Sequence, residues 1–227
     1  MTKSWWGLIR NLLILLAVIG SFAYSAFPIA LPLGLLSKPE GRAGVFLVGS
    51  IFGELAAMFV LVRFLKRSGG NLNDLGFRQP TTRLALLSGV FVALVYSGWT
   101  ALNPHVGPGM LQLSILKIPA IVAALVAGVV EEVIFRGYVM TTLLQMGYGN
   151  VVQVLVGGIT FALAHLYGFT SPEAFLITQG STFILGIMLG IIYLIGRRSL
   201  TPVIVSHALT DMIIEPALLL SFFTVIK

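Results

Sequence analysis

Apolar residues are gathered along this chain into long blocks rather than into the short amphipathic runs of a soluble domain. Most blocks hold about 20 residues, the length that an α-helix needs to cross the roughly 30 Å apolar core of a bilayer. Every backbone polar group inside a bilayer must be hydrogen-bonded within the protein, so we expect these blocks to be helices. The pattern predicts seven spans: Leu8–Phe27, Gly44–Leu65, Leu84–Leu102, Ile118–Gln145, Val151–Tyr167, Ala174–Ile195 and Pro202–Phe223.

The composition is typical of a membrane protein. Of the 227 residues, 57% are hydrophobic and only 10% are charged, whereas soluble domains carry about a quarter charged residues. No low-complexity linker and no repeat divides the chain. We therefore expect one integral membrane domain over residues 1–227, an all-α polytopic bundle of about seven spans (six to eight). The absence of cysteine excludes disulfides, thiolate metal sites and a cysteine nucleophile.

The net charge of +6 is explained by membrane orientation better than by a nucleic-acid partner, because the basic residues lie mostly between the apolar blocks. Five of them cluster at the loop between the second and third blocks, four within it and Arg63 at the end of the second block, which predicts that this loop is cytoplasmic. Alternating spans then place nine basic residues on the cytoplasmic side and four on the other, with Arg136 inside a span. The N-terminus is therefore predicted to be cytoplasmic.

Polar residues inside the fourth block need a reason, because a charge at mid-bilayer costs at least ~2.5–3.5 kcal/mol on insertion scales. Glu132 and Arg136 are four residues apart, which places them on one helix face in the favourable order for a salt bridge. Glu131 points about 100° away from that face, by the 3.6-residue period of the helix. It therefore needs a partner from another helix or must carry a proton.

Two further blocks carry paired polar or aromatic residues with the same spacing. Phe161 precedes His165 by one helical turn, and His207 precedes Asp211 by one turn. Glu131 and His165 each lie 17 residues from Tyr148, at the turn between the fourth and fifth blocks. In an antiparallel hairpin they come level, each about 25 Å from the turn. His207 reaches the same depth only if the tip of this hairpin protrudes beyond the loop that precedes the seventh block.

A purely structural role is the alternative for each of these residues. A single histidine in a span is often a packing residue, and a Glu–Arg pair alone is often structural. Three motifs at compatible depth favour a common site over a purely structural network. Glu54, alone in the second block, and Glu215, near the end of the seventh, have no such support.

This set of residues can activate water in two ways. Glu131 with His165 could act as a general base, while His207 and Asp211 bind the developing oxyanion or hold the partner groups. Alternatively, Glu131, His165 and His207 could hold a Zn²⁺ ion that carries the water. The chain has no G-x-S-x-G elbow and no H-E-x-x-H zinc helix. The sequence leaves both routes open.

The ordered motifs E-E-x-x-x-R, F-x-x-x-H and H-x-x-x-D resemble the CPBP family of intramembrane proteases. That family includes the Rce1-like type II CAAX prenyl endopeptidases and the bacterial abortive-infection proteins. The resemblance covers about residues 118–211. It implies that Glu131 activates the water beside His165, that His207 and Asp211 complete the site, and that Glu132, Arg136 and Phe161 support it. The position of Asp211 is often Asn in prenyl-processing members, which argues against a neutral oxyanion donor here.

The leading hypothesis is therefore an intramembrane endopeptidase that cuts a hydrophobic or lipidated peptide in contact with membrane lipid. The short loops resemble those of bacterial members, which predicts a bacterial cell membrane. A non-catalytic immunity or scaffold protein on the same fold is the alternative, and its function would survive Glu131→Gln. A transporter with a proton relay is the third reading, although the repeats that would favour it are absent. The natural substrate is not encoded in these motifs.

Overall fold

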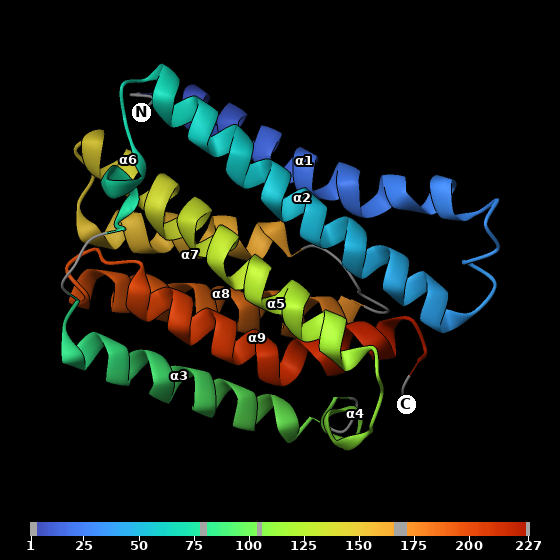
Figure 1. Cartoon of the computed structure of the whole chain (residues 1–227). Helices are drawn as coiled ribbons and strands as arrows, with labels where there is room; N and C mark the ends of the chain where they lie inside the picture. The colour runs from blue at the N-terminus through green and yellow to red at the C-terminus, as the bar shows by residue number, and fades with distance from the viewer. Residues whose placement is uncertain (1–3, 78–80, 104–105, 166–171, 226–227) are drawn as a thin grey trace. The chain divides into compact units, whose positions relative to one another are not determined.

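The computed structural model of the chain describes residues 4–77, 81–103, 106–165 and 172–225. The described residues are helical and form no β-strand (Figure 1). The elements, in chain order, are α1 (Trp5–Ala30), α2 (Pro39–Arg67), η1 (Leu72–Leu75), α3 (Arg83–Ala101), α4 (Gly107–Leu111), α5 (Lys117–Glu132), η2 (Val133–Met140), α6 (Thr141–Gln145), α7 (Asn150–Ala164), α8 (Pro172–Ile195) and α9 (Thr201–Phe222).

Six of the predicted spans correspond to helices that are long and apolar enough to cross a membrane, among the described residues. They are α1, α2, α3, the continuous run Lys117–Gln145, α8 and α9. The fifth predicted span, Val151–Tyr167, differs. It forms α7, which has 15 residues and is about 22 Å long, and its predicted end at Tyr167 lies outside the described residues. The all-α polytopic fold is thus confirmed, with one helix shorter than a full span.

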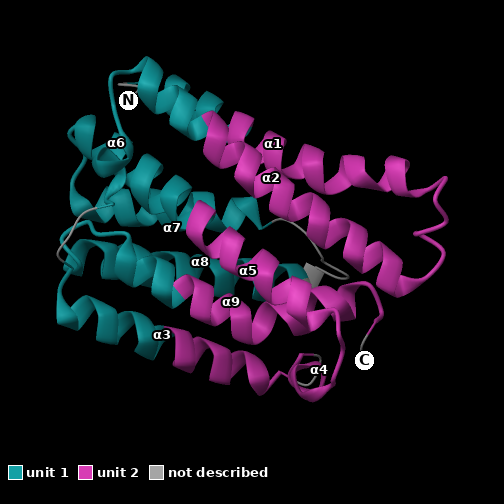
Figure 2. Ribbon diagram, viewed as in Figure 1, with its two compact units in different colours: residues 1–13, 61–92, 131–206 teal, residues 14–60, 93–130, 207–227 magenta. Residues whose placement is uncertain are grey.

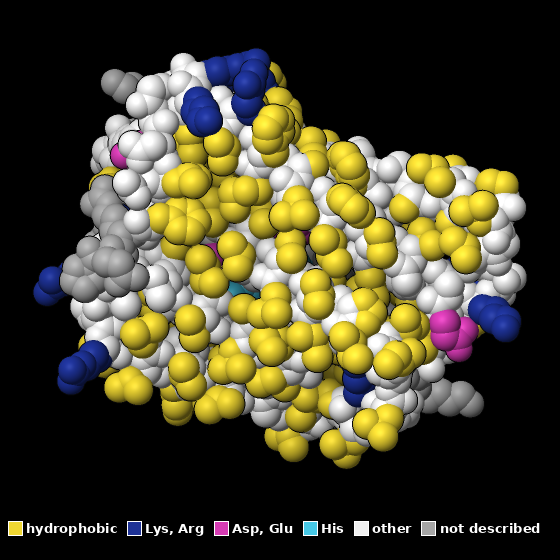
Figure 3. Space-filling view, in the orientation of Figure 1, with side chains coloured by type: hydrophobic (Ala, Val, Ile, Leu, Met, Phe, Trp, Pro, Cys, Tyr) yellow, Lys and Arg dark blue, Asp and Glu magenta, His cyan; other side chains and the backbone are white. Residues whose placement is uncertain are grey.

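Large hydrophobic side chains lie on the outer surface of the helices. Leu87, Phe91 and Phe59 are each about two-thirds exposed or more, and hydrophobic side chains cover much of the face drawn in Figure 3. Soluble proteins rarely expose such large apolar patches. Together with the six long apolar helices, this surface identifies an integral membrane protein.

The chain divides into two compact units (Figure 2). Unit 1 contains residues 1–13, 61–92 and 131–206, and unit 2 contains residues 14–60, 93–130 and 207–227. The candidate residues Glu131, Glu132, Arg136, Phe161 and His165 therefore belong to unit 1. His207 and Asp211 belong to unit 2. The single domain expected over residues 1–227 stays a prediction.

In unit 1, α7 and α8 cross closely at a pair of glycines. A methyl group added to Gly186 would come within 3.0 Å of the Cα atom of Gly158 and 3.2 Å of Cδ1 of Phe161. Real Cβ atoms avoid such distances, so side chains at this crossing would force the helices apart. The crossing thus brings the backbone of α8 against the part of α7 that carries Phe161.

In unit 2, α5 and α9 approach each other closely at Gly128. A Cβ atom at this position would lie 2.9 Å from Cα of Ala208 and 3.0 Å from its backbone nitrogen. The neighbouring backbone cannot yield as the end of a flexible side chain could. The close contact fixes the start of the His207–Asp211 turn of α9 against α5.

We expect Gly128→Ala to lower the free energy of unfolding by about 1–3 kcal/mol, because the added methyl group overpacks the α5–α9 contact. Gly98 on α3 is the matched control, since a Cβ atom there meets nothing within 4 Å. Gly98→Ala should be neutral or stabilising by up to about 1 kcal/mol, because alanine favours the helix. Equilibrium unfolding in detergent measures both variants. Equal stability of the two would contradict the close contact.

Candidate functional site

A buried arginine organises the unit 1 part of the site. Arg136 and Glu132 are fully buried, and the predicted salt bridge between Arg136 Nη1 and Glu132 Oε1 is present. The second terminal nitrogen of Arg136 donates to the carbonyl oxygen of Gly186 at 2.9 Å. The guanidinium carbon lies 4.7 Å from the centre of the Phe161 ring, close enough for a cation–π contact. Arg136 therefore ties η2 to both α7 and α8.

The helix that carries the two glutamates changes its hydrogen-bonding pattern directly after them. Glu131 and Glu132 end α5, and the next eight residues, Val133–Met140, form a π-helix whose residues are all buried. π-helical turns place hydrogen bonds between residues i and i+5, are rare, and are frequent at functional sites. The regular helical period used for the sequence prediction therefore does not extend beyond Glu132.

His165 lies at the end of α7 rather than inside it. The helix ends at Ala164, and His165 is its C-cap, with φ −99° and ψ 30°. The expectation that Phe161 and His165 share one continuous helical turn is wrong in this respect. The two rings are nevertheless in contact, with centroids 4.5 Å apart. Because α7 ends at Ala164, His165 can reach backbone groups that it could not reach from inside a continuous helix.

The hydrogen bond of the His165 ring defines its tautomer. Nδ1 lies 2.8 Å from the carbonyl oxygen of Phe161, and a carbonyl can only accept, so Nδ1 carries the proton. In the neutral ring, Nε2 then presents a lone pair. Nε2 lies 3.5 Å from Oε2 of Glu131, which confirms that the hairpin brings these two residues level.

Glu131 and His165 thus present an oxygen and a nitrogen that both accept hydrogen bonds when the carboxylate is ionised and the ring is neutral. Such a pair is suited to hold a proton, a water molecule or a cation. Two ligands of a tetrahedral Zn²⁺ would lie roughly 3.4 Å apart, given bond lengths of about 2.0–2.2 Å, so the two residues fit that role as well. Within the described part of the chain, no three His, Cys, Asp or Glu side chains form a group that could hold a metal ion.

The unit 2 part of the site is the pair on α9. Nε2 of His207 lies 3.2 Å from Oδ2 of Asp211, and the His207 side chain is 2% exposed while that of Asp211 is 17% exposed. The predicted one-turn contact is therefore present. A carboxylate at this distance can accept from Nε2 and so orients the imidazole ring. That this pair and Glu131–His165 form one site stays a prediction, because the pairs belong to different units.

Two contacts from α8 were not predicted from the sequence. Gly186 supplies the carbonyl that accepts from Arg136, and Gln179 donates its amide to the carbonyl oxygen of His165 at 3.0 Å. Every residue type has a backbone carbonyl, so the sequence gives no indication that the carbonyl of Gly186 accepts from Arg136. Gln179 did have one, since a glutamine in a membrane span needs a hydrogen-bond partner.

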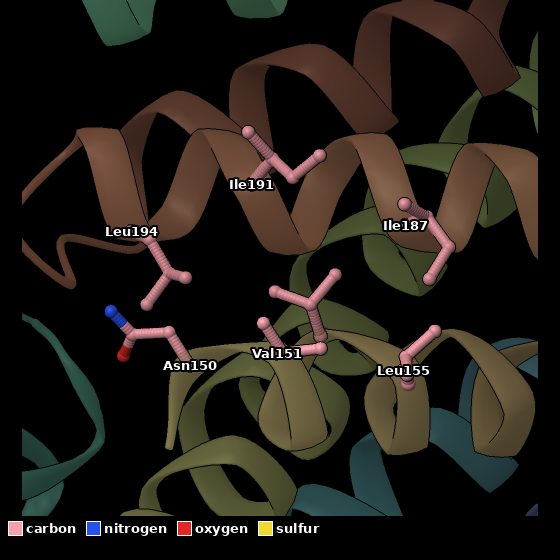
Figure 4. A pocket seen from close by; sticks show the side chains of 7 residues that line it. Asn150, Val151, Leu155, Ile187, Ile191 and Leu194 are labelled. Atoms are coloured by element: carbon pink, nitrogen blue, oxygen red, sulfur yellow. The ribbon is translucent and has the colours of Figure 1, made fainter.

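An apolar hollow lies between α7 and α8, apart from these polar residues (Figure 4). Its volume is about 290 Å³. Apart from Asn150, its lining is aliphatic: Asn150, Val151, Val154, Leu155, Ile187, Ile191 and Leu194. None of the residues that line it has a side chain that can transfer a proton in the way a carboxylate or an imidazole can. Neither Glu131 nor His165 lines this hollow.

Comparison with known proteins agrees with the motifs. Residues 113–213 match the family model described as type II CAAX prenyl endopeptidase, Rce1-like. This segment contains every site residue proposed from the sequence, and the predicted resemblance is thereby confirmed over that range. No curated protein and no solved structure matches the chain.

Proposed function

From the Rce1-like segment of this integral membrane protein, we propose that the chain is an intramembrane endopeptidase. Its substrate is a hydrophobic or lipidated peptide in contact with membrane lipid. The single observation that carries the proposal is the Glu131–His165 pair, whose facing oxygen and nitrogen lie 3.5 Å apart. Both side chains are 17% exposed, and the facing carboxylate oxygen, Oε2 of Glu131, is itself buried.

In the proposed reaction, a water molecule donates hydrogen bonds to Glu131 Oε2 and His165 Nε2. Glu131 takes one proton as the water oxygen bonds to the carbonyl carbon of the scissile peptide, and the carbonyl electron pair moves to its oxygen. The C=O bond then re-forms, the C–N bond breaks, and the proton held by Glu131 passes to the leaving nitrogen. One water is consumed, and a carboxylic acid and an amine are released.

His207 and Asp211 are assigned to the negative charge that develops on the carbonyl oxygen. The Asp211 carboxylate lies beside Nε2 of His207 and orients the imidazole, which would donate a hydrogen bond to the oxyanion.

The metal-dependent route uses the same residues. It would need Glu131, His165 and His207 to hold a zinc ion that polarises the attacking water, but among the described residues no three such side chains are grouped to hold a metal ion, so only the Glu131–His165 part of that ligand set is formed. The separation of the Glu131 and His165 donors supports either route. The roles of these side chains in orienting the substrate and moving the proton are the same in both.

The direct test is cleavage by purified protein reconstituted in proteoliposomes. Two internally quenched peptides of one sequence ending in a CaaX motif serve as probes, one prenylated on its cysteine and one unmodified. We expect cleavage of at least the prenylated peptide at a single bond. Metal content of the protein and cleavage after chelator treatment separate the two routes. Failure to cleave either peptide, with folded protein and intact vesicles, would count against the proposal.

Asp211→Asn should lower kcat by about tenfold and leave KM nearly unchanged. The amide can still accept a hydrogen bond from His207 but loses the charge, and hydrogen bonds to charged groups exceed neutral ones by about 1–1.5 kcal/mol. Asp211→Ala should lower kcat further. Steady-state kinetics with the cleaved probe peptide measure both. An Asp211→Asn protein as active as wild type would indicate a neutral donor at this position.

A further inference from the structure

Most basic residues of the chain lie in segments of unit 1 that contain almost no acidic residue. Nine basic residues and one acidic residue, Asp74, occur in four segments of this unit: residues 1–13, 61–92, 141–153 and 190–206. The Asp74 carboxylate accepts from the backbone nitrogen of the residue that caps η1, at 2.7 Å. The four segments together therefore carry a strong excess of positive charge.

Contacts within unit 1 hold these segments together at one end. Nε1 of Trp5 donates to the hydroxyl of Tyr148 at 2.6 Å, which joins the start of α1 to the turn before α7. Arg198 donates to Oε1 of Gln153 at 2.8 Å, which joins α7 to the loop before α9. The backbone nitrogen of Leu200 donates to a carbonyl in the loop between α2 and α3 at 2.9 Å. The basic residues of these segments are thereby gathered at one end of unit 1.

The start of α1 and the end of α2 lie at the same depth. A Cβ atom on Gly53 of α2 would lie 2.7 Å from the carbonyl oxygen of Ile19 on α1, and the preceding glycine of α2 approaches a later part of α1. The two helices therefore run antiparallel in close contact. Lys66 is 13 residues after Gly53, and Trp6 is 13 residues before Ile19. Both lie about 20 Å from the contact.

Exposed basic side chains and a tryptophan share this depth. Lys66 and Arg67 follow Arg63 by three and four residues, so the three share one face of α2, and all are exposed. Figure 3 shows Lys and Arg side chains gathered over this end of α2. On α1, Trp6 is 73% exposed, and Arg10, one turn later, is also exposed. Tryptophan is enriched where the apolar core of a bilayer meets its headgroups.

Clusters of about four to eight Lys and Arg beside the end of a spanning helix attract anionic lipids. Among the described residues, the exposed basic side chains of unit 1, here called the basic end, are Arg10, Arg63, Lys66, Arg67, Arg83 and Arg197. We propose that the basic end binds anionic phospholipid headgroups of the surrounding bilayer. The cations meet the lipid phosphates, while Trp6 and the aliphatic stems of the basic side chains lie among the upper acyl chains. This binding does not depend on the proposed peptidase function.

Quenching of tryptophan fluorescence by brominated lipids reports which lipids lie at each end. The chain has three tryptophans. Trp99 is 72% exposed and lies 16 residues after Arg83 on α3, about 24 Å along the helix. Trp99→Phe leaves the two tryptophans near the basic end as reporters. Trp5→Phe combined with Trp6→Phe leaves Trp99 as the reporter away from it.

Full-length protein is reconstituted in vesicles of equal parts phosphatidylglycerol and phosphatidylcholine, in which one lipid or the other is brominated. In the Trp99→Phe protein, we expect phosphatidylglycerol to be enriched at the basic end by about fivefold or more, the factor for one Lys or Arg near an anionic surface. Adding Lys66→Gln should lower this preference by about two- to fivefold, and Lys66→Arg should keep it. Lys38→Gln is the matched control, because Lys38 is an exposed lysine of unit 2, in the loop between α1 and α2.

A second set of measurements separates lipid headgroups from free anions. Sodium chloride should weaken the preference by screening, and inorganic phosphate at the same ionic strength should weaken it no further. Trp99 should show no preference in any protein, and its unchanged signal reports that the fold is intact. Equal quenching by the two brominated lipids at the basic end would overturn the proposal, as would a preference that survives Lys66→Gln. Loss of the preference in phosphate but not in chloride would overturn it in favour of a site for a free anion.

Discussion

Glu131→Gln is expected to lower kcat for peptide cleavage by about 10³-fold, within the 10²–10⁴-fold range of general acid–base catalysis. Glutamine keeps the shape of the side chain and can still contact Nε2 of His165, which lies 3.5 Å from the native carboxylate. It cannot take a proton from water. The fold should persist, because Glu131 is not part of the Arg136 salt bridge. Steady-state kinetics in proteoliposomes and unfolding in detergent measure the two effects separately.

The adjacent residue is the control for this prediction. Glu132→Gln removes the charge that pairs with the buried Arg136, so we expect a clear loss of stability in addition to any loss of rate. Glu131→Gln should give the opposite pattern, with full stability and almost no rate. If the two variants behaved alike, the separate roles assigned to the neighbouring carboxylates would be wrong.

Arg136→Met should lower the free energy of unfolding by about 3–5 kcal/mol, the cost of leaving one partner of a buried ion pair uncompensated. The substitution also removes the hydrogen bond to Gly186 and the cation over Phe161. Because Phe161 contacts His165, the Arg136→Met molecules that remain folded should also cleave the probe peptide more slowly than the wild type. Equilibrium unfolding in mixed detergent measures the stability.

A double variant tests the cause of that loss. Glu132→Gln combined with Arg136→Met removes both charges, so the buried carboxylate is no longer left without its cation. The double variant should be more stable than Arg136→Met alone, although it still lacks the Gly186 contact. A double variant less stable than either single one would indicate that the ion pair is not what holds η2 in place.

Much of the fold and the pairing could be predicted from residue types and spacing. Block length predicted seven spans, and six of them correspond to long apolar helices whose ends lie within a few residues of the predicted ones. The four-residue spacings predicted Glu132–Arg136 and His207–Asp211, and equal distance from Tyr148 predicted Glu131–His165. These contacts depend on periodicity and hairpin geometry, which the positions of polar residues in an apolar block reveal directly.

The π-helix and the end of α7 could not be predicted in the same way. Residues 133–140 are all buried, so no alternation of exposed and buried positions reports a change of helical period. The first glycine after Ala164 in the sequence is Gly168, four residues on, so the pattern predicts that the helix ends at Tyr167 rather than at Ala164. The helix ends where a side chain on α8 takes up the His165 carbonyl, and such a contact depends on the tertiary fold.

The central claim is that water activated at Glu131 hydrolyses a peptide bond. It is tested most directly by the mass of the product formed from the prenylated probe peptide in H₂¹⁸O. Wild-type proteoliposomes should release a fragment whose new carboxyl group carries one ¹⁸O atom from the solvent, and Glu131→Gln proteoliposomes should release almost none. An unlabelled fragment, or an equal yield from the Glu131→Gln protein, would contradict the claim.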